Sequence, residues 1–295
     1  MEIQPWRWLE VLVFSLPEDY EQSWTLASSV KRKGVGLHTG ELSTVQLKPF
    51  DQPGFYLSWK DSPNPPFELN PTQVLHTPLC TTLELGSRRL ATVEHLFGAL
   101  AGCGITHVHI EVSGNEIPLL DGSAKEWVDA IEEAGISNAS SLRKPIPIVK
   151  EPIVKTRGNS AITAIPSERF KLIGIIDFSY PVIDKQIFSI ELTPQVFIEE
   201  IAPARTFGFK DQLEDLKNSG LIKGGSLENA LVCDGENWIN PPLRFPDEPI
   251  RHKLLDLIGD LSLVGFPKAQ ILVYRGSHGL HADLASDLFK ASNSH

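Results

Sequence analysis

Residues 92–112 read TVEHLFGALAGCGITHVHIEV, and residues 251–274 read RHKLLDLIGDLSLVGFPKAQILVY. In each stretch apolar residues recur at helical spacing, a glycine follows, and apolar and polar residues then alternate as they do in a strand. Each predicted helix also carries a histidine, His95 in the first and His252 in the second. The repeated plan predicts an α+β fold of two related lobes with a site between them.

The length of the chain predicts two domains. At 295 residues it exceeds what one hydrophobic core usually supports. Residues 137–147 are rich in Ser, Asn, basic residues and proline, which is typical of a boundary segment. We therefore place domain I at 24–143 and domain II at 144–295. Residues 1–23 form a leader with less regular patterning, whose purpose the sequence does not define.

Composition and charge exclude several classes of protein. The formal net charge is −10, so no excess of Lys and Arg is available to displace counterions from nucleic acid. The apolar run before Pro17 is interrupted by Glu10 and is far too short to span a membrane. The three cysteines are far apart and odd in number, which argues against a disulfide framework. We expect a cytoplasmic monomer with no nucleic-acid partner and no stable membrane insertion.

The rest of the chain adds elements of the same α+β kind. In the first half, strands are expected at 25–31 and 44–47 on either side of a glycine-rich turn, and a second helix at 124–134. Thr92 is a plausible N-cap for the first helix. In the second half, the patterning predicts strands at 146–155, 161–165 and 172–178 and a helix at 209–219.

The motif His252-Lys253-Leu254-Leu255-Asp256 is the clearest chemical signal. An imidazole and a carboxylate four residues apart lie on one face of a helix. Such ligands suit zinc, and a catalytic zinc takes three protein ligands and a water. The same spacing also fits a surface His–Asp pair. Glu94-His95 places a carboxylate beside another possible ligand, where it can act as a general base, although adjacent Glu and His also occur by chance.

Asp260 extends the polar face of the second histidine-bearing helix by one more turn. Several polar groups on one face of a leucine-rich helix are costly to bury unless they are paired, which favours a site. The run Arg275-Gly276-Ser277-His278-Gly279-Leu280-His281 follows a predicted strand. Either of its histidines, His278 or His281, can serve as a general acid.

Taken together, these motifs resemble those of one family, the UDP-3-O-acyl-N-acetylglucosamine deacetylases, which carry out the committed step of lipid A biosynthesis. The matching stretches occur in the family's order: GVGLHTG at 34–40, TVEHL at 92–96, EIPLLDGS at 116–123, ARTFGF at 204–209, GGS at 224–226, RHKLLD at 251–256, GD at 259–260 and GSH at 276–278. Any one of these motifs is weak, but the ordered set over about residues 24–288 is highly specific.

The resemblance implies two similar lobes, each a β-sheet with helices, with the helices of both lobes packed between the two sheets. It also implies a small insert in each lobe, which we place at about 54–78 and about 206–235. In the family, the second insert shapes a hydrophobic passage for an acyl chain. Phe207 and Phe209 suit that role as substrate-binding residues.

The same resemblance implies a metal site with one zinc ion per chain. By its motifs, His95, His252 and Asp256 bind the zinc. Glu94 is then the general base that activates the water on the metal. The spacing of the ligands supports the metal site independently of the resemblance.

Further roles carry over from the matching motifs. His278 protonates the leaving amine, and Asp260 orients His278. Thr206, with the zinc, stabilises the oxyanion. Lys253 and Arg275 are expected to hold the polar and phosphate groups of the substrate, supplying local positive charge in an acidic chain.

The sequence departs from the family at few positions. His281 stands where many members have Asn, so the proton donor is less firmly assigned to His278, and Glu94 is another candidate. Cys80 falls where the family often has a cysteine near the metal. The sequence leaves the roles of Cys80 and His38 open, together with the preferred acyl-chain length and the metal used in the cell.

These assignments predict zinc-dependent hydrolysis of the N-acetyl group of UDP-3-O-acyl-N-acetylglucosamine, which gives acetate and a free amine. One alternative is a catalytically silent sugar-nucleotide-binding protein, which we would expect to lack Glu94 or a metal ligand. Another is a zinc amidase that acts on a different N-acetyl sugar. The apolar residues in 206–235 favour the acylated substrate over a bare sugar.

Overall fold

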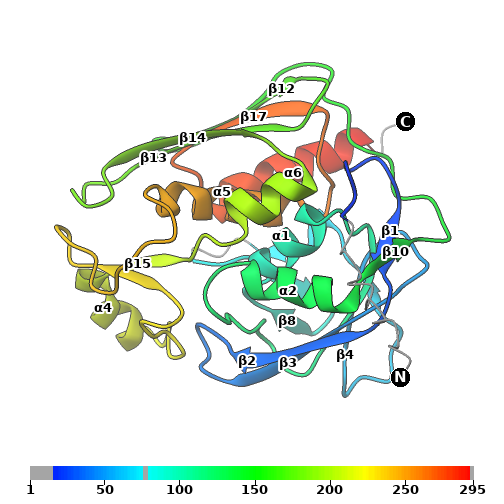
Figure 1. The fold of residues 1–295 in the computed structure, drawn as a ribbon, viewed down its shortest axis with the longest axis horizontal. Helices are drawn as coiled ribbons and strands as arrows, with labels where there is room; N and C mark the ends of the chain where they lie inside the picture. The colour runs from blue at the N-terminus through cyan, green and yellow to red at the C-terminus, as the bar shows by residue number, and fades with distance from the viewer. Residues whose placement is uncertain (1–15, 76–78, 293–295) are drawn as a thin grey trace, which may run out of the picture.

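The computed structural model describes residues 16–75 and 79–292. Two large sheets form the outer layers, and helices from both halves of the chain lie between them (Figure 1). The predicted α+β class with helices between two sheets is confirmed. Most of the predicted leader, residues 1–15, lies outside the described residues, as do residues 76–78 of the first predicted insert.

The first large sheet collects strands from the first half of the chain. Its centre is β9 (His107–Val112), which pairs antiparallel with β3 (Leu42–Lys48) and parallel with β4 (Gly54–Trp59). Alternate residues of β9, namely Val108, Ile110 and Val112, are fully buried, as expected for a strand with one face on the core. The remaining members are β1 (Trp24–Leu26), β2 (Val30–Val35), β5 (Phe67–Glu68) and β10 (Ile136–Asn138).

The second large sheet collects strands from the second half. In spatial order they are β11 (Ile153–Arg157), β12 (Ser160–Pro166), β17 (Ala269–Tyr274), β13 (Lys171–Asp177) and β14 (Lys185–Glu191). Only β13 and β17 run parallel, and the other neighbours in this sheet are antiparallel. The side chains of Ile162, Ala164 and Ile271 are buried against the helices.

Two helices from each half fill the middle layer: α1 (Glu94–Gly102), α2 (Lys125–Ala134), α5 (Glu248–Leu261) and α6 (His278–Ser292). Helices α1 and α5 approach each other unusually closely, because glycines lie at their crossing. A Cβ atom on Gly259 would lie 2.1 Å from the carbonyl oxygen of Glu94, and one on Gly98 would lie 2.9 Å from Leu255. This contact brings the first turn of α1 against the middle of α5.

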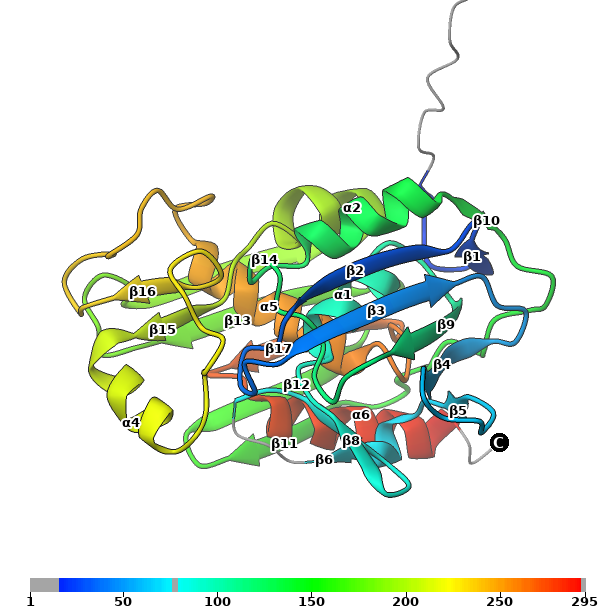
Figure 2. The same cartoon turned by 90° about the horizontal axis from the view of Figure 1, so that it is seen from below.

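Small elements lie at the margins of the layers (Figure 2). β6 (Val74–Leu75), β7 (Thr82–Leu85) and β8 (Arg88–Leu90) form a three-stranded sheet, and β15 (Phe207–Phe209) pairs with β16 (Leu231–Cys233) beside α4 (Leu213–Asn218). The short helical turns are η1 (Pro71–Gln73), α3 (Pro194–Val196), η2 (Phe197–Ile201) and η3 (Lys210–Gln212).

The structure places several elements differently from the sequence patterns. The predicted first insert at 54–78 includes β4, which belongs to the large sheet, and the separate small sheet lies at 74–90. The expected strand at 25–31 is split into β1 and β2, and the expected helix at 209–219 begins only after β15 and a helical turn. β14 and α6 were not anticipated. The domain boundary near residue 143 stays a prediction.

Thr92 does not cap α1, contrary to the sequence prediction. Its φ of 59° places it in the left-handed region, and its hydroxyl donates to Oε1 of Glu116 at 2.9 Å. The residue at the cap position is Val93, which offers no side-chain acceptor. The hydroxyl of Thr92 therefore holds a loop of the first lobe instead of the helix end.

Candidate active site

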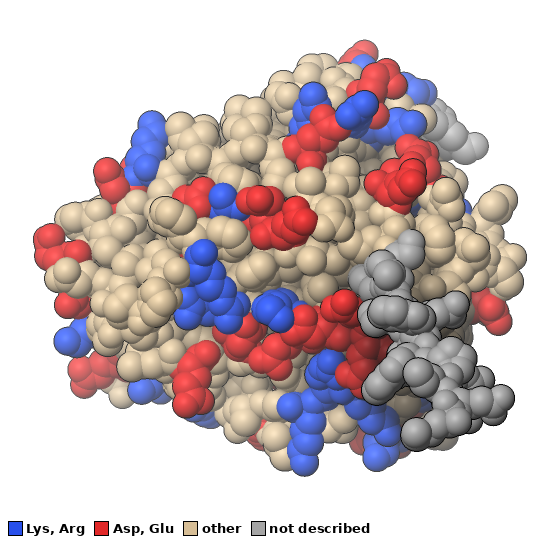
Figure 3. Space-filling model, viewed as in Figure 1, with Lys and Arg blue, Asp and Glu red and all other residues tan. Residues whose placement is uncertain are grey.

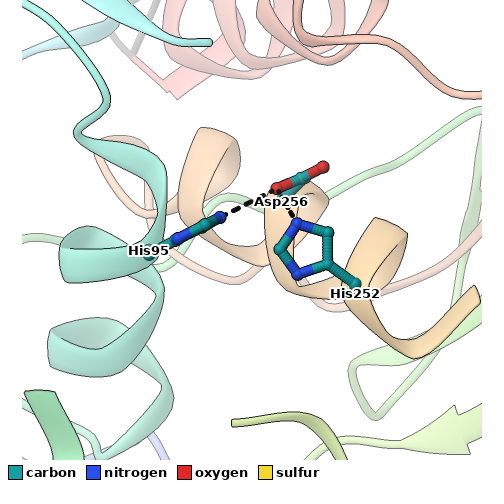
Figure 4. Close-up of side chains that lie close together, drawn as sticks. All are labelled: His95, His252 and Asp256. Atoms are coloured by element: carbon teal, nitrogen blue, oxygen red, sulfur yellow. Dashed lines mark ion pairs between the residues drawn. The ribbon is translucent and has the colours of Figure 1, made fainter. Parts of the chain in front are cut away.

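Three side chains suited to bind a metal converge where α1 crosses α5. His95 lies in the first turn of α1, and His252 and Asp256 lie one turn apart on α5, so all three point toward one another (Figure 4). Asp256 Oδ1 lies 3.6 Å from His95 Nε2 and 3.5 Å from His252 Nε2. All three residues are buried. We call His95, His252 and Asp256 the first cluster.

The surroundings of the first cluster fix the protonation states of His252 and Asp256. His252 Nδ1 lies 3.0 Å from the carbonyl oxygen of Ala204, which can only accept, so Nδ1 carries the proton and Nε2 presents a lone pair toward Asp256. Burial lowers the pKa of His252 to about 3. Burial acts to raise the pKa of Asp256, but Lys253 and His252 hold it well below its ordinary value. The cluster thus combines a neutral imidazole with an ionised carboxylate.

A second group of acidic and imidazole side chains lies one turn further along α5. Asp260 Oδ2 accepts hydrogen bonds from Nδ1 of both His278 and His281, each at 2.8 Å. The other carboxylate oxygen accepts from the hydroxyl of Thr81. Burial acts to lower the pKa of His278, but Asp260 raises it to about 10. His278 is therefore an imidazolium at neutral pH. We call Asp260, His278 and His281 the second cluster.

Glu94 stands between the two clusters. Its carboxylate is buried, and Oε2 accepts the backbone N–H of Thr81 at 3.0 Å. Burial raises the pKa of Glu94, while His278 and His95 lower it in part, and the net shift is upward. A carboxylate whose pKa is raised toward neutrality is suited to receive a proton and give it back.

A cavity of about 460 Å³ opens beside the clusters. Thr206, Lys253 and His278 contribute polar groups to its lining. Much of the remaining wall is apolar and comes from residues in and around α4 and β15, two elements that lie close together at one end of the molecule (Figures 1 and 2). These apolar residues are Phe178, Phe207, Phe209, Leu213, Leu216, Ile222, Leu227 and Val232. Such a lining fits a ligand that has both a polar part and an extended apolar part.

The structure brings together all but one of the site residues that the sequence predicted. Arg275 is the exception, because its guanidinium donates to Asp177 at 2.9 Å and it is not part of the cavity lining. His38 does line the cavity, and both of its buried ring nitrogens are without a hydrogen-bond partner among the described residues. Burial raises the pKa of Cys80 to about 11, so that it stays a thiol.

Three groups that shape the site had no assigned role from the sequence. Thr81 contacts both Glu94 and Asp260, and Ala204 fixes the tautomer of His252. Glu116 accepts the backbone N–H groups of residues 38 and 39, both at 2.8 Å, and so shapes the loop that carries His38. Glu116 lies in the EIPLLDGS motif, but Thr81 and Ala204 act through a hydroxyl, an N–H and a carbonyl that no spacing rule singles out.

Residues 23–290 match the family model described as UDP-3-O-acyl N-acetylglycosamine deacetylase. The chain belongs to this family. It is 46% identical over 278 residues to a UDP-3-O-acyl-N-acetylglucosamine deacetylase of Trichormus variabilis, a match that covers 91% of this chain and 99% of the relative. A relative of the same name from Synechocystis sp. is 45% identical, covering 90% of this chain and 97% of the relative.

A plant relative is similar over nearly the same length. It is named probable UDP-3-O-acyl-N-acetylglucosamine deacetylase 1, mitochondrial, from Arabidopsis thaliana, and is 41% identical over 286 residues, covering 90% of this chain and 87% of the relative. Membership of the family identifies the chain as a deacetylase that acts in lipid A biosynthesis, and the silent binding protein is not favoured. The family is one of metalloenzymes, and the two clusters are groups that can hold a metal ion.

The charge pattern of one face and the character of the helices add two observations. Basic and acidic side chains lie intermixed across the face shown in Figure 3, which therefore carries no broad basic surface for nucleic acid. Among residues 16–75 and 79–292, no helix has the length and apolar character needed to cross a bilayer.

Proposed function

We propose that this deacetylase hydrolyses the N-acetyl amide of UDP-3-O-acyl-N-acetylglucosamine with one zinc ion held by His95, His252 and Asp256. The products are acetate and UDP-3-O-acyl-glucosamine. The observation that carries the proposal is the convergence of these three ligands, with Glu94 beside them, next to a cavity that is both polar and apolar.

The first cluster fits zinc in both chemistry and spacing. Two ligand atoms bound to one zinc at about 2.0–2.1 Å with a tetrahedral angle lie about 3.4 Å apart. The separations of 3.5 and 3.6 Å between Asp256 Oδ1 and the two Nε2 atoms are close to that value. When bound, zinc supplies a Lewis acid that makes water more acidic and polarises a carbonyl oxygen.

Glu94 is the general base in this proposal. Residues of both clusters act on its pKa, and we propose that its carboxylate takes a proton from the attacking water. The bond from Thr81 N–H fixes Oε2, and the raised pKa of Glu94 makes its carboxylate a stronger base for that proton. The fixed carboxylate accepts the proton without having to reorient first.

His278 is the proposed proton donor to the leaving amine. Asp260 binds its Nδ1, so the Nε2 edge is left for the substrate. The raised pKa keeps a proton on the ring at neutral pH, which is the state that an acid needs. Proton return through Glu94 is the alternative route. Thr206 is the proposed donor to the oxyanion, since it lines the same cavity as Lys253 and His278.

The cavity supports an acylated sugar nucleotide over another N-acetyl sugar. Phe207 and Phe209 stand in its wall with the leucines of α4, and burial of an acyl chain there would gain about 25 cal/mol per Å² of apolar surface. Lys253 supplies positive charge at the cavity. Arg275 would have to leave Asp177 to hold a phosphate, so its role stays a prediction. A cytoplasmic location and a monomeric state also stay predictions of the sequence.

The proposal is tested by acetate release from UDP-3-O-acyl-N-acetylglucosamine, measured with the purified protein before chelation, after chelation and after zinc is added back. We expect activity to be lost with the metal and restored by about one zinc per chain. The same assay on UDP-N-acetylglucosamine, which lacks the acyl chain, should give far less acetate. Acetate release that is indifferent to chelation, or none from folded, zinc-loaded protein, would contradict the proposal.

A further inference from the structure

Glu248 is a fully buried carboxylate that the proposed reaction does not use. It lies at the start of α5 and is 0% exposed. A buried carboxylate costs several kcal/mol unless hydrogen bonds and opposite charge compensate it. Both of its oxygens are fully engaged. Oε1 accepts the backbone N–H and Nε of Arg205, each at 2.9 Å, and Oε2 accepts the backbone N–H of Arg244 at 2.6 Å and a guanidinium N–H of Arg205 at 3.2 Å.

The peptide that Glu248 holds belongs to a segment that touches the site on either side. Immediately before Arg205, the carbonyl of Ala204 accepts the proton of His252 Nδ1 at 3.0 Å. Immediately after it, Thr206 lines the cavity, and its N–H is bonded to the carbonyl of Gly122 at 2.7 Å. Fixing the N–H of Arg205 therefore constrains both a carbonyl that orients a proposed zinc ligand and a proposed oxyanion donor.

The same carboxylate organises a junction between the two lobes. Arg244, whose backbone N–H it accepts, reaches Asp121 at 2.8 Å and Ser123 at 3.2 Å, both in the first lobe. Arg244 also donates to the carbonyl of Pro203 at 2.8 Å. Glu248 thus holds the segment 203–206 through two arginines, Arg205 within the segment and Arg244, which bridges to the opposite lobe.

We propose that Glu248 is a positioning residue, whose carboxylate holds Ala204–Thr206 so that His252 presents Nε2 to the metal and Thr206 faces the cavity. The inference rests on the proposed zinc site. Carbonyl partners of a metal-bound histidine fix its tautomer, and loss of such partners typically costs 10- to 100-fold in metal affinity or activity. Glu248 acts one step further out, because it fixes the carbonyl itself.

Only a carboxylate can accept all of the hydrogen bonds offered to the side chain at position 248. Four N–H groups point at the side chain and each needs an acceptor. In Glu248→Gln the shape is kept, but an NH₂ group, which is itself a donor, replaces one carboxylate oxygen. At least one of the four N–H groups therefore loses its acceptor. We expect the segment to shift and the bond from Ala204 to His252 to weaken.

The chain offers a matched control in Glu116. Its carboxylate is also buried and also accepts four hydrogen bonds, from the N–H groups of His38 and Thr39 and the hydroxyls of Thr39 and Thr92. Within residues 16–75 and 79–292, it makes no hydrogen bond or ion pair with Ala204 or His252. Glu116→Gln therefore removes a comparable buried carboxylate but leaves the tautomer of His252 untouched.

Two measurements on each variant test the proposal. One is the zinc dissociation constant by competition with a chelator, and the other is the tautomer of His252 in the metal-free protein, from ¹⁵N-resolved NMR of the imidazole. We expect Glu248→Gln to raise the dissociation constant about 10- to 100-fold and to reduce the population of the Nδ1–H form. Glu116→Gln should change the dissociation constant by less than about threefold and keep that form.

An unchanged dissociation constant and tautomer in Glu248→Gln would overturn the proposal, and so would equal effects in the two variants. If Glu248→Gln does not fold, Glu248→Asp carries the test by the same criteria, because the shorter side chain keeps the charge but cannot reach all four donors. Wild-type acetate release is measured in parallel. Its absence would contradict the proposed reaction alone, since neither measurement requires turnover.

Discussion

The two clusters use the same kinds of residue, but His252 in the first is neutral and His278 in the second is positively charged. In the first, His252 has its Nδ1 on a carbonyl oxygen, and burial lowers its pKa to about 3. In the second, His278 has its Nδ1 on the carboxylate of Asp260, which raises its pKa to about 10 against the effect of burial. Both imidazoles are largely shielded from solvent. The partner of one nitrogen, more than burial, decides whether the ring carries a charge.

This difference assigns different chemistry to each cluster. A neutral imidazole with a free Nε2 beside an ionised carboxylate attracts a cation, whereas an imidazolium is itself a cation and can donate a proton. Asp256 and Asp260 lie one turn apart on α5, so a single helix supplies a carboxylate to both. Glu94, on the facing helix, stands between the two clusters, and charges in both clusters change its pKa.

The largest expected effect comes from removing the group between the clusters. Glu94→Ala should lower kcat/KM for acetate release by about 10²–10⁴-fold, because general base catalysis contributes about that much. Zinc content should stay near one per chain, since Glu94 is not one of the three ligands. Metal analysis and steady-state kinetics on the same preparation check both statements.

Glu84→Ala is the control, because Glu84 is half-exposed on β7 and pairs with Arg89. It should leave both readouts near wild type. Normal turnover in Glu94→Ala would remove the general-base assignment. Loss of zinc from that variant would instead indicate that Glu94 helps to bind the metal.

A smaller effect is expected from forcing the two helices apart. In Gly259→Ala the new methyl group meets the backbone of Glu94 at the helix crossing, so α1 must shift away from α5. Overpacking of this kind typically costs about 1–3 kcal/mol of unfolding free energy. A displacement of about 1 Å in a catalytic group can cost about 10²-fold in rate. Urea denaturation and kinetics check the two effects, with Ser286→Ala on α6 as a control.

If Gly259→Ala kept wild-type stability and activity, the close approach of α1 and α5 would not be what positions His95 against His252. The same variant should also bind zinc more weakly, because the ligands come from both helices. Retained affinity would count against a site shared between the two lobes.

The smallest effect in rate, and the most specific in pH, is expected from Asp260→Asn. Without the carboxylate, burial dominates and the pKa of His278 falls from about 10. The basic limb of the pH profile of kcat/KM should then move to lower pH. A basic limb that stays in place would assign that limb to a group other than His278.

The ion pair between Asp260 and His278 should also contribute to the free energy of unfolding. The folded-state pKa of His278 lies above its ordinary value of 6.5, so its contribution is fully present below about pH 6.5 and is lost as pH rises toward about 10. The difference in unfolding free energy between wild type and Asp260→Asn should therefore shrink over that range. A difference that grows with pH would contradict the charge state given to the second cluster.

The sequence predicted the architecture where periodicity was strong. The two histidine-bearing helices and the strands after them were recognised because leucines, glycines and alternating residues mark them clearly. The sequence analysis placed no helix over α6, because Gly276 and Gly279 around its start are poor helix formers, whereas His278 and His281 lie in its first turns. It also missed β14 (Lys185–Glu191), although a turn at 181–183 with Pro181 and a left-handed Asp184 precede it.

For the site, the sequence identified the groups with distinctive chemistry and missed those that position them. His252, Asp256 and Asp260 are visible because their spacing matches a helical face. The carbonyl of Ala204, the N–H of Thr81 and the carboxylate of Glu248 act through contacts between residues remote in the chain. No local pattern reports such contacts, since tertiary packing creates them. Arg275 shows the converse: the sequence proposed it for the substrate's polar groups, whereas in the structure its guanidinium pairs with Asp177, and its role stays a prediction.

The assignment of zinc to the first cluster is tested most directly by anomalous diffraction at the zinc absorption edge from crystals of the zinc-loaded protein at one equivalent of metal. We expect one strong peak within bonding distance of His95 Nε2, His252 Nε2 and Asp256 Oδ1. We expect no peak among Asp260, His278 and His281, because the imidazolium repels a cation. A peak in the second cluster instead of the first would contradict the assignment of metal binding to one cluster and proton donation to the other.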